Sequence, residues 1–282
     1  NAILGQLRMI YDGRMTKASG KSGGEGITWQ GHAGFIAGST PSIYRFLAEA
    51  ADMGERFVNY RMKPMNEDAA VDFVMRSGLS SKQIDEKMKD LYAQYYSYLM
   101  PKVKEFHIPI DKETESAIVN IAKAGTKLRT PVTVDEREHF VSEFVVPEMP
   151  FRVMKQLTNL AKAFMVMNYA ETGNDVLPPD MRTAIEWVGY SLADDKRRAY
   201  FKAVLGLQKQ GLKVTARNIS SYTGLHHTAV ERGMSILSAI GVVKLNEVRE
   251  GDKKDRTWDV ADTRLKGIVE RIDPPPHVDE ED

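Results

Sequence analysis

The spacing of apolar residues predicts a mainly helical chain. Between residues 66 and 170, apolar side chains recur every three or four positions in the segments 67–76, 81–99, 112–124 and 151–169. This spacing gives an α-helix one buried face. Prolines punctuate these segments, at Pro101, Pro109, Pro131, Pro147 and Pro150. The pattern therefore predicts a helical bundle in this part of the chain.

The first 65 residues follow a mixed pattern. Helices are expected at 4–11 and 42–53, and a strand pair at 27–29 and 34–37, with a glycine-rich loop at 20–26. We therefore expect a small α/β part at this end of the chain.

A third pattern begins near residue 212. Thr215 can cap a short helix, and Gly224 can adopt the positive φ of a tight turn. A second helix is expected to start at the pair His226–His227 and to end before Gly241. Its apolar positions share one face; they are Val230, Met234, Leu237 and Ile240.

Two short strands are expected next, at 242–245 and 257–260, around a charged loop at 249–256. Two helices joined by a tight turn form the helix-turn-helix of many DNA-binding domains. A hairpin directly after them is typical of a wing. We interpret this part of the sequence as a C-terminal winged helix-turn-helix.

The outer side of the second helix is expected to carry side chains that suit phosphates and base edges. They are His226, His227, Thr228, Arg232 and Ser235. Further DNA-contacting residues are expected on the first helix and in the wing, namely Arg217, Lys253, Lys254 and Arg256. Residues 197–266 hold 14 lysines and arginines against 7 aspartates and glutamates, whereas the whole chain has no net charge. This asymmetry is expected of a nucleic-acid-binding surface, so double-stranded DNA is the predicted partner.

Length and composition set the domain plan. A chain of 282 residues exceeds the usual size of one domain. We expect a partial α/β segment at 1–65, a helical lid-like domain at 66–173, the winged helix at 180–272 and a disordered acidic tail at 273–282. Residues 174–179, which follow Gly173 and contain Asn, Asp and two prolines, are the expected linker. The absence of cysteine agrees with a cytoplasmic protein, and no apolar run has the length of a membrane span.

Short motifs in this sequence resemble those of an ATPase family. The segment 32–40 predicts a buried strand that ends at Thr40, the segment 54–61 follows one helix later, and Arg152 lies at the start of another helix. Together they resemble the C-terminal half of an AAA+ helicase-like P-loop ATPase of phages and other mobile elements, distantly similar to the mini-chromosome maintenance helicases. A winged helix behind the lid also suits that arrangement.

The resemblance implies roles for four residues. Thr40 would be the sensor-1 residue that orients the attacking water. Arg56 or Arg61 would be an arginine finger that stabilises charge on the nucleotide of a neighbouring subunit, and Arg152 would be the sensor-2 arginine. The resemblance also implies ATP and Mg²⁺ in the full-length protein, a homo-oligomeric ring on DNA, and a role in mobile-element replication.

The chain departs from this family at the phosphate-binding loop, which needs the pattern G-x-x-x-x-G-K-[ST]. The residues Gly20, Lys21 and Ser22 match its end, but Met15 replaces the first glycine, and no acidic pair follows an apolar strand. We therefore expect no ATP hydrolysis by this chain alone, and no cofactor within it. The chain is interpreted either as the C-terminal fragment of a longer ATPase, favoured by a start without Met, or as a stand-alone remnant. The histidines lack metal-ligand spacing, so no metal site is expected.

Simpler roles remain open for the same residues. Arg56 and Arg61 can form surface ion pairs with nearby acidic side chains. Arg152 can pair with Glu148, and Thr40 can cap a helix. For the chain as a whole, one alternative is a transcriptional regulator that binds operator DNA as a homodimer. Another is a protein-interaction module that binds no DNA.

Overall fold

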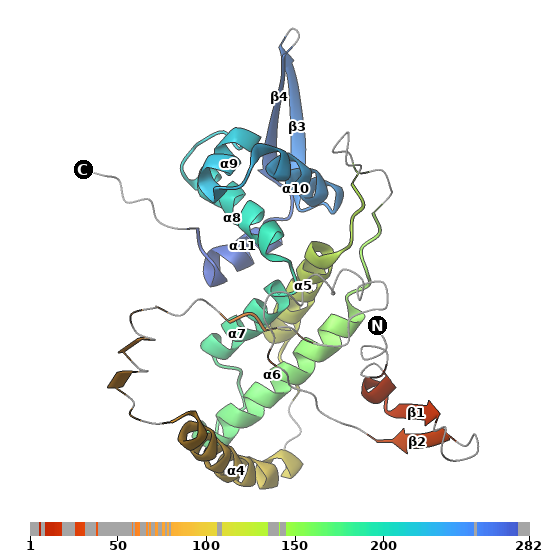
Figure 1. The fold of residues 1–282 in the computed structure, drawn as a ribbon, viewed down its shortest axis with the longest axis vertical. Helices are drawn as coiled ribbons and strands as arrows, with labels where there is room; N and C mark the ends of the chain where they lie inside the picture. Colours follow the sequence, from red (N-terminus) through yellow and green to blue (C-terminus); the bar gives the residue numbers. More distant parts are fainter. Residues whose placement is uncertain are drawn as a thin grey trace. The chain divides into compact units, whose positions relative to one another are not determined.

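The structure is a computed structural model that describes part of the chain. It describes residues 6, 9–18, 26–31, 38, 58, 60–62, 66, 68, 71–72, 75–76, 78, 80–105, 109–134, 141, 145–250 and 253–275. These residues belong to two compact units, Asn1–Val58 and Asn59–Asp282. The described part is mainly helical (Figure 1), as the apolar spacing predicts.

The first unit contains an antiparallel hairpin. Its strands are β1 (Arg14–Ala18) and β2 (Gly26–Gln30). The hydroxyls of Thr16 and Thr28, which face each other in the register, lie 3.1 Å apart. The partner strand β1 was not predicted from the sequence. The predicted strand at 34–37 and helix at 42–53 lie outside the described residues, whereas residues 6 and 9–11 are helical as expected.

Eight helices and a second hairpin are described in the second unit. They are α4 (Ser81–Glu105), α5 (Lys112–Arg129), α6 (Phe151–Thr172), α7 (Pro179–Tyr190), α8 (Asp195–Lys209), α9 (Ala216–Thr223), α10 (His227–Ala239), β3 (Val243–Glu250), β4 (Lys253–Val260) and α11 (Thr263–Ile272). The helices predicted at 81–99, 112–124 and 151–169 are confirmed, each with a longer C-terminal end. The prediction that Pro101 ends the first of these is wrong, because α4 continues through it.

One apolar core joins the helices of the second unit from α5 to α11. It extends from Ile118 of α5 to Ile272 of α11, and α11 packs against both α5 and α7. The expected boundary between a lid-like domain and a C-terminal domain therefore does not divide the structure into separate units. The predicted linker 174–179 is an ordered connection, because its Leu177 is only 1% exposed within this core.

The start of α5 offers a test of local stability. The Asp111 carboxylate caps this helix by accepting hydrogen bonds from the Thr114 N–H at 2.8 Å and the Thr114 hydroxyl at 2.7 Å. These bonds hold the pKa of Asp111 below its usual value. Loss of such a cap lowers the free energy of unfolding by about 1 kcal/mol, and we expect this loss at pH 7 for Asp111→Ala, measured by urea denaturation.

The same variant has a defined pH dependence. A carboxyl group whose pKa is lowered by folding contributes stability above its unfolded pKa, and this contribution disappears as the pH falls through the folded pKa. The difference between the wild type and Asp111→Ala should therefore shrink below about pH 4. Asp111→Asn keeps a side-chain acceptor and serves as the control. A difference that is constant from pH 7 to pH 3 would contradict the capping role.

Candidate nucleic-acid interface

The two helices of the candidate interface begin and end at residues that the local sequence identifies. The Thr215 hydroxyl accepts a hydrogen bond from the Asn218 N–H at 3.2 Å and so caps α9. Gly224 follows α9 with φ 69°, in the left-handed region that favours glycine. The N-cap of α10 is His226, and Gly241 follows that helix with φ 69°. Both predicted helices and the turn between them are confirmed.

A glycine lets α10 lie close to α8. The Tyr200 ring of α8 packs on Gly233, where a methyl carbon would stand only 2.0 Å from the ring. The Tyr200 hydroxyl donates to the Ala229 carbonyl at 3.0 Å, and burial raises the pKa of this phenol above its usual value. Three further side chains of α10 are fully buried, and they are Val230, Met234 and Leu237. This packing fixes which side of α10 faces outwards.

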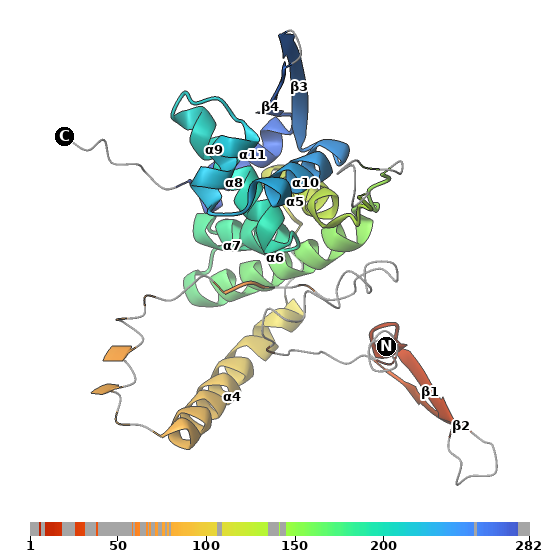
Figure 2. The same cartoon turned by 45° about the horizontal axis from the view of Figure 1, so that its top comes forward.

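The β3–β4 hairpin extends the same core. Trp258 of β4 is 3% exposed, and its backbone N–H donates to the Val214 carbonyl at 3.1 Å. The segment between α8 and α9 therefore lies beside β4. The two strands pair along their whole lengths, so the charged stretch 249–256, predicted as a loop, is mostly strand. The hairpin projects away from α9 and α10 in both views (Figures 1 and 2).

The outward side of α10 is polar, as predicted. Thr228, Arg232 and Ser235 follow one another at positions i, i+4 and i+7, which places them on one helix face. Thr228 and Arg232 are exposed, and Ser235 is half-buried. Arg232 makes no hydrogen bond or ion pair with other residues of the described part. Its guanidinium therefore remains available to a ligand.

The two histidines lie at the start of the same helix. A ring nitrogen of His226 lies 2.9 Å from the Thr228 hydroxyl. His227 lies 3.8 Å from the carboxylate of Glu231, one turn further along. Because His226 provides no side-chain cap, the first N–H groups of α10 have no capping partner from that side chain. Free N–H groups at a helix N-terminus favour an anion such as a phosphate.

The expected contacts outside α10 differ in how available they are. Arg217 of α9 is exposed and has no partner among the residues that the structure describes. Arg256 donates to Glu247 across the hairpin at 2.8 Å, so part of its charge is neutralised. Lys253 and Lys254 belong to β4, but their side chains lie outside the described part.

The local positive charge contributes less to this surface than the sequence implies. Arg197 donates to two carbonyls at the end of α5, at 2.6 and 2.8 Å. Arg198 pairs with Asp195. Lys202 pairs with Asp273 at 2.6 Å. Arg197 and Lys202 hold α8 to neighbouring segments, whereas Arg198 pairs within α8 itself. Because all three cations already have partners, they do not add to the charge beside α10.

The residues singled out by the ATPase resemblance are only partly described. Thr40 and Arg56 lie outside the described residues. Arg61 is 7% exposed, its Nε donates to the Ser191 carbonyl at 3.1 Å, and its Nη1 pairs with Asp195. The guanidinium is therefore engaged within the chain, in an ion pair with a residue other than the nearby acidic side chains expected as its simpler partners. A role as an arginine finger stays a prediction.

The Arg61 contacts form a cluster at the junction of α7 and α8. The Trp187 indole N–H donates to the Arg61 carbonyl at 2.8 Å. Arg198 lies 5.5 Å from the Trp187 ring centroid, within cation–π range. Partial burial acts to raise the pKa of Asp195, but hydrogen bonds and charge from Arg198 and Arg61 outweigh it, and the pKa of this carboxyl is lowered. The cluster anchors the beginning of the second unit.

Arg152 lies at the start of α6 and is partly exposed. Its Nη1 is 3.7 Å from the Glu148 carboxylate, which also accepts from Arg129 at 2.5 Å. This is the ion pair expected as the simpler role of Arg152. A role as a sensor of nucleotide stays a prediction.

Two further features bear on the type of site. Over the residues that the structure describes, no group of three or more His, Cys, Asp or Glu side chains is arranged to hold a metal ion. No described helix is long and apolar enough to cross a membrane.

Known proteins do not extend this picture. No protein-family model, no curated protein and no solved structure matches the chain.

Proposed function

We propose that the segment from α8 to α11 is a winged helix that binds double-stranded DNA. In this proposal α10 enters the major groove and the β3–β4 hairpin is the wing. The observation that carries it is the arrangement of α8, α9, α10 and the hairpin on one core, with the polar side of α10 turned outwards. The contact between Val214 and Trp258, which adds a short third segment beside β4, also supports it.

Each part of the outward side of α10 suits a different contact. The uncapped N-terminal turn at His226 and His227 favours a phosphate. Arg232 has a free fork of donors, and such donors bind either phosphate or the edge of guanine. Thr228 and Ser235 can donate or accept along the same face. The surface therefore combines contacts that position DNA with contacts that read its bases.

The resemblance to AAA+ helicase-like ATPases leads to a broader proposal. In it, this DNA-binding segment would hold a ring-shaped motor on DNA, with ATP and Mg²⁺ bound by parts that this chain lacks. Its support is the sequence motifs alone, and the burial of Arg61 does not add to it. The competing proposal is a homodimeric regulator that recognises operator DNA.

Removing two cations from the proposed surface should weaken DNA binding. We expect Arg232→Ala combined with Lys253→Ala to raise the Kd for a random duplex about tenfold or more at low salt, since each phosphate-binding cation adds to the electrostatic attraction. The slope of the logarithm of the association constant against the logarithm of the salt concentration should become shallower by about 1 for each phosphate that is no longer neutralised. Fluorescence anisotropy with a labelled duplex at several salt concentrations measures both.

Lys162→Ala is the matched control, because it removes an exposed positive charge from α6, away from the proposed surface. It should leave the Kd unchanged. Equal affinity of the double variant and the wild type would refute the proposed DNA surface. No binding at all by the wild type at low salt would favour a protein-interaction module.

The same assay separates the two DNA-binding proposals. Weak, strongly salt-dependent binding to any sequence is expected of an accessory DNA contact in a motor. A homodimeric regulator would instead prefer a palindrome whose half-sites lie about one helical turn apart.

A further inference from the structure

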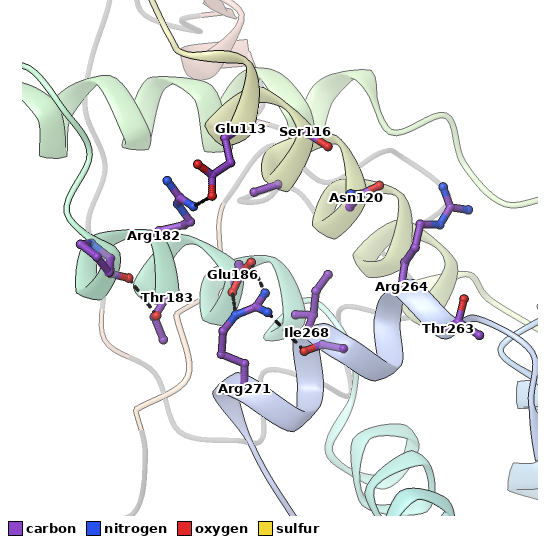
Figure 3. A pocket seen from close by; sticks show the side chains of 13 residues that line it. Glu113, Ser116, Asn120, Arg182, Thr183, Glu186, Thr263, Arg264, Ile268 and Arg271 are labelled. Atoms are coloured by element: carbon purple, nitrogen blue, oxygen red, sulfur yellow. Dashed lines mark hydrogen bonds and ion pairs between the residues drawn. The ribbon is translucent and has the colours of Figure 1, made fainter.

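A separate cavity lies between α5, α7 and α11. It has a volume of about 530 Å³, which is within the range of small-molecule sites. Figure 3 shows side chains from all three helices converging on it. Most of its polar lining comes from Ser116, Asn120, Thr183, Thr263, Arg182, Arg264 and Arg271. A smaller cavity of about 210 Å³ adjoins it, and Asn120 and Arg264 line both.

Every carboxylate that lines the two cavities already has a cationic partner. In the larger cavity, Glu186 accepts from two nitrogens of Arg271 at 3.0 and 2.6 Å, and Glu113 pairs with Arg182. In the smaller cavity the pairs are Asp262 with Lys127, at 3.1 Å, and Glu148 with Arg129, at 2.5 Å. The negative charge of the lining is thus neutralised by residues of the chain itself.

Two cations that line the smaller cavity have no such partner, and one of them, Arg264, also lines the larger cavity. The side chains of Arg264 and Lys123 form no hydrogen bond or ion pair with other residues in the described ranges, and neither does the amide of Asn120. Arg264 extends from α11 towards α5 beside Asn120 (Figure 3). An excess of positive charge and several unused donors therefore meet at one concave place.

We propose that this junction binds a small organic anion through a phosphate or carboxylate group. The guanidinium of Arg264 can bind either group with two parallel hydrogen bonds, while Lys123 adds a point charge and Asn120 an amide donor. The rest of the ligand would occupy the larger cavity against Ala117 and Ile268, which give it an apolar wall. The walls come from three helices, and this concave shape favours a small molecule over the convex backbone of a duplex.

The position of the cavity gives the ligand a structural role. α11 follows β4 directly, and Asp262 at its N-terminus donates through its N–H to the Val242 carbonyl at 3.2 Å. The same Asp262 pairs with Lys127 of α5. A ligand between α5 and α11 would therefore fasten the hairpin-bearing end of the chain to the helical bundle. Binding of this ligand would require no DNA.

Thermal unfolding of the whole chain tests the proposal. Inorganic phosphate, glycerol 3-phosphate and succinate are added separately at constant ionic strength. A ligand that binds only the folded state raises Tm in proportion to the logarithm of its concentration above Kd. We expect at least one of these anions to raise Tm, with a Kd in the millimolar range. Comparison of phosphate with succinate shows whether the site prefers a phosphate or a carboxylate group.

Two variants and one control complete the test. Arg264→Gln should raise the Kd at least tenfold and Lys123→Gln severalfold, whereas Lys162→Gln should bind as the wild type does. Both altered side chains are exposed, so the variants should fold. An equal Tm response in Arg264→Gln and the wild type, or no response to any of the anions, would overturn the proposal. If Arg264→Gln weakened duplex binding while none of the anions bound, the junction of the two cavities would instead be a contact site for DNA phosphates.

Discussion

Gly125→Ala is expected to lower the free energy of unfolding by about 1–2 kcal/mol. Gly125 lies on α5 where this helix crosses α7, and a methyl group there would stand 2.5 Å from the Gly189 carbonyl oxygen and 3.0 Å from the Leu192 side chain. This steric clash can be relieved only if the two helices separate, because the oxygen that the methyl group would contact belongs to the backbone of α7. Overpacking of this kind costs about 1–3 kcal/mol or more, and it exceeds the gain of about 1 kcal/mol that alanine gives in a helix.

Gly267→Ala is the matched control. Gly267 also lies inside a helix, α11, but a methyl group there meets no atom within 4 Å. The same substitution should therefore raise the free energy of unfolding by up to about 1 kcal/mol through helix propensity. Urea denaturation of both variants measures the two changes. Similar small effects at the two positions would contradict a tight crossing of α5 and α7.

Local signals in the sequence predicted the helices around the candidate interface well. Thr215 and Gly224 act on backbone groups within a few residues of themselves, so their effects do not depend on distant parts of the chain. The outward positions of Thr228 and Arg232 followed from helical periodicity in the same way. These are the features of the candidate site that a single sequence can provide.

Long-range contacts explain most of what the sequence did not predict. The partners Trp187, Ser191 and Asp195 are 126 or more residues away from Arg61, so no local pattern predicted its burial. The polar residues around Leu177 resemble a linker, yet one apolar side chain fixes the segment in the core. The inward pairing of Arg197 on α8 likewise depends on α5, which is why the sequence overstated the charge available to DNA.

Helix α11 is a different case, because its signals were present in the sequence. Asp262 caps the helix by accepting from the Leu265 N–H at 3.1 Å, and Leu265, Ile268, Val269 and Ile272 follow at helical spacing. The helix was not predicted, because the winged-helix pattern is already complete at the second strand. It matters for the fold, since α11 provides a wall of the cavity and Arg271, the cationic partner of the buried Glu186.

Arg271→Met is expected to lower the free energy of unfolding by about 2–3 kcal/mol. Arg271 of α11 binds Glu186 of α7 through two nitrogens, and the Glu186 side chain is only 4% exposed. Removing the cation leaves a buried carboxylate without its partner, which costs about 3–5 kcal/mol when both groups are buried. The arginine itself is 53% exposed beside an open cavity. Water can therefore reach the carboxylate, and the lower estimate applies.

A thermodynamic cycle separates this ion pair from the loss of packing. Replacing both residues, as Glu186→Leu with Arg271→Met, should restore most of the lost stability, because it removes the uncompensated charge together with its partner. Arg264→Met changes the same residue type on the same helix at an unpaired, exposed position, and it should alter stability by less than about 0.5 kcal/mol. Urea denaturation of the wild type, Glu186→Leu, Arg271→Met and the double variant gives the coupling energy between Glu186 and Arg271. If Arg271→Met were no more destabilising than Arg264→Met, the pair would not hold α11 to α7, and that helix would have to be fixed by its apolar face alone.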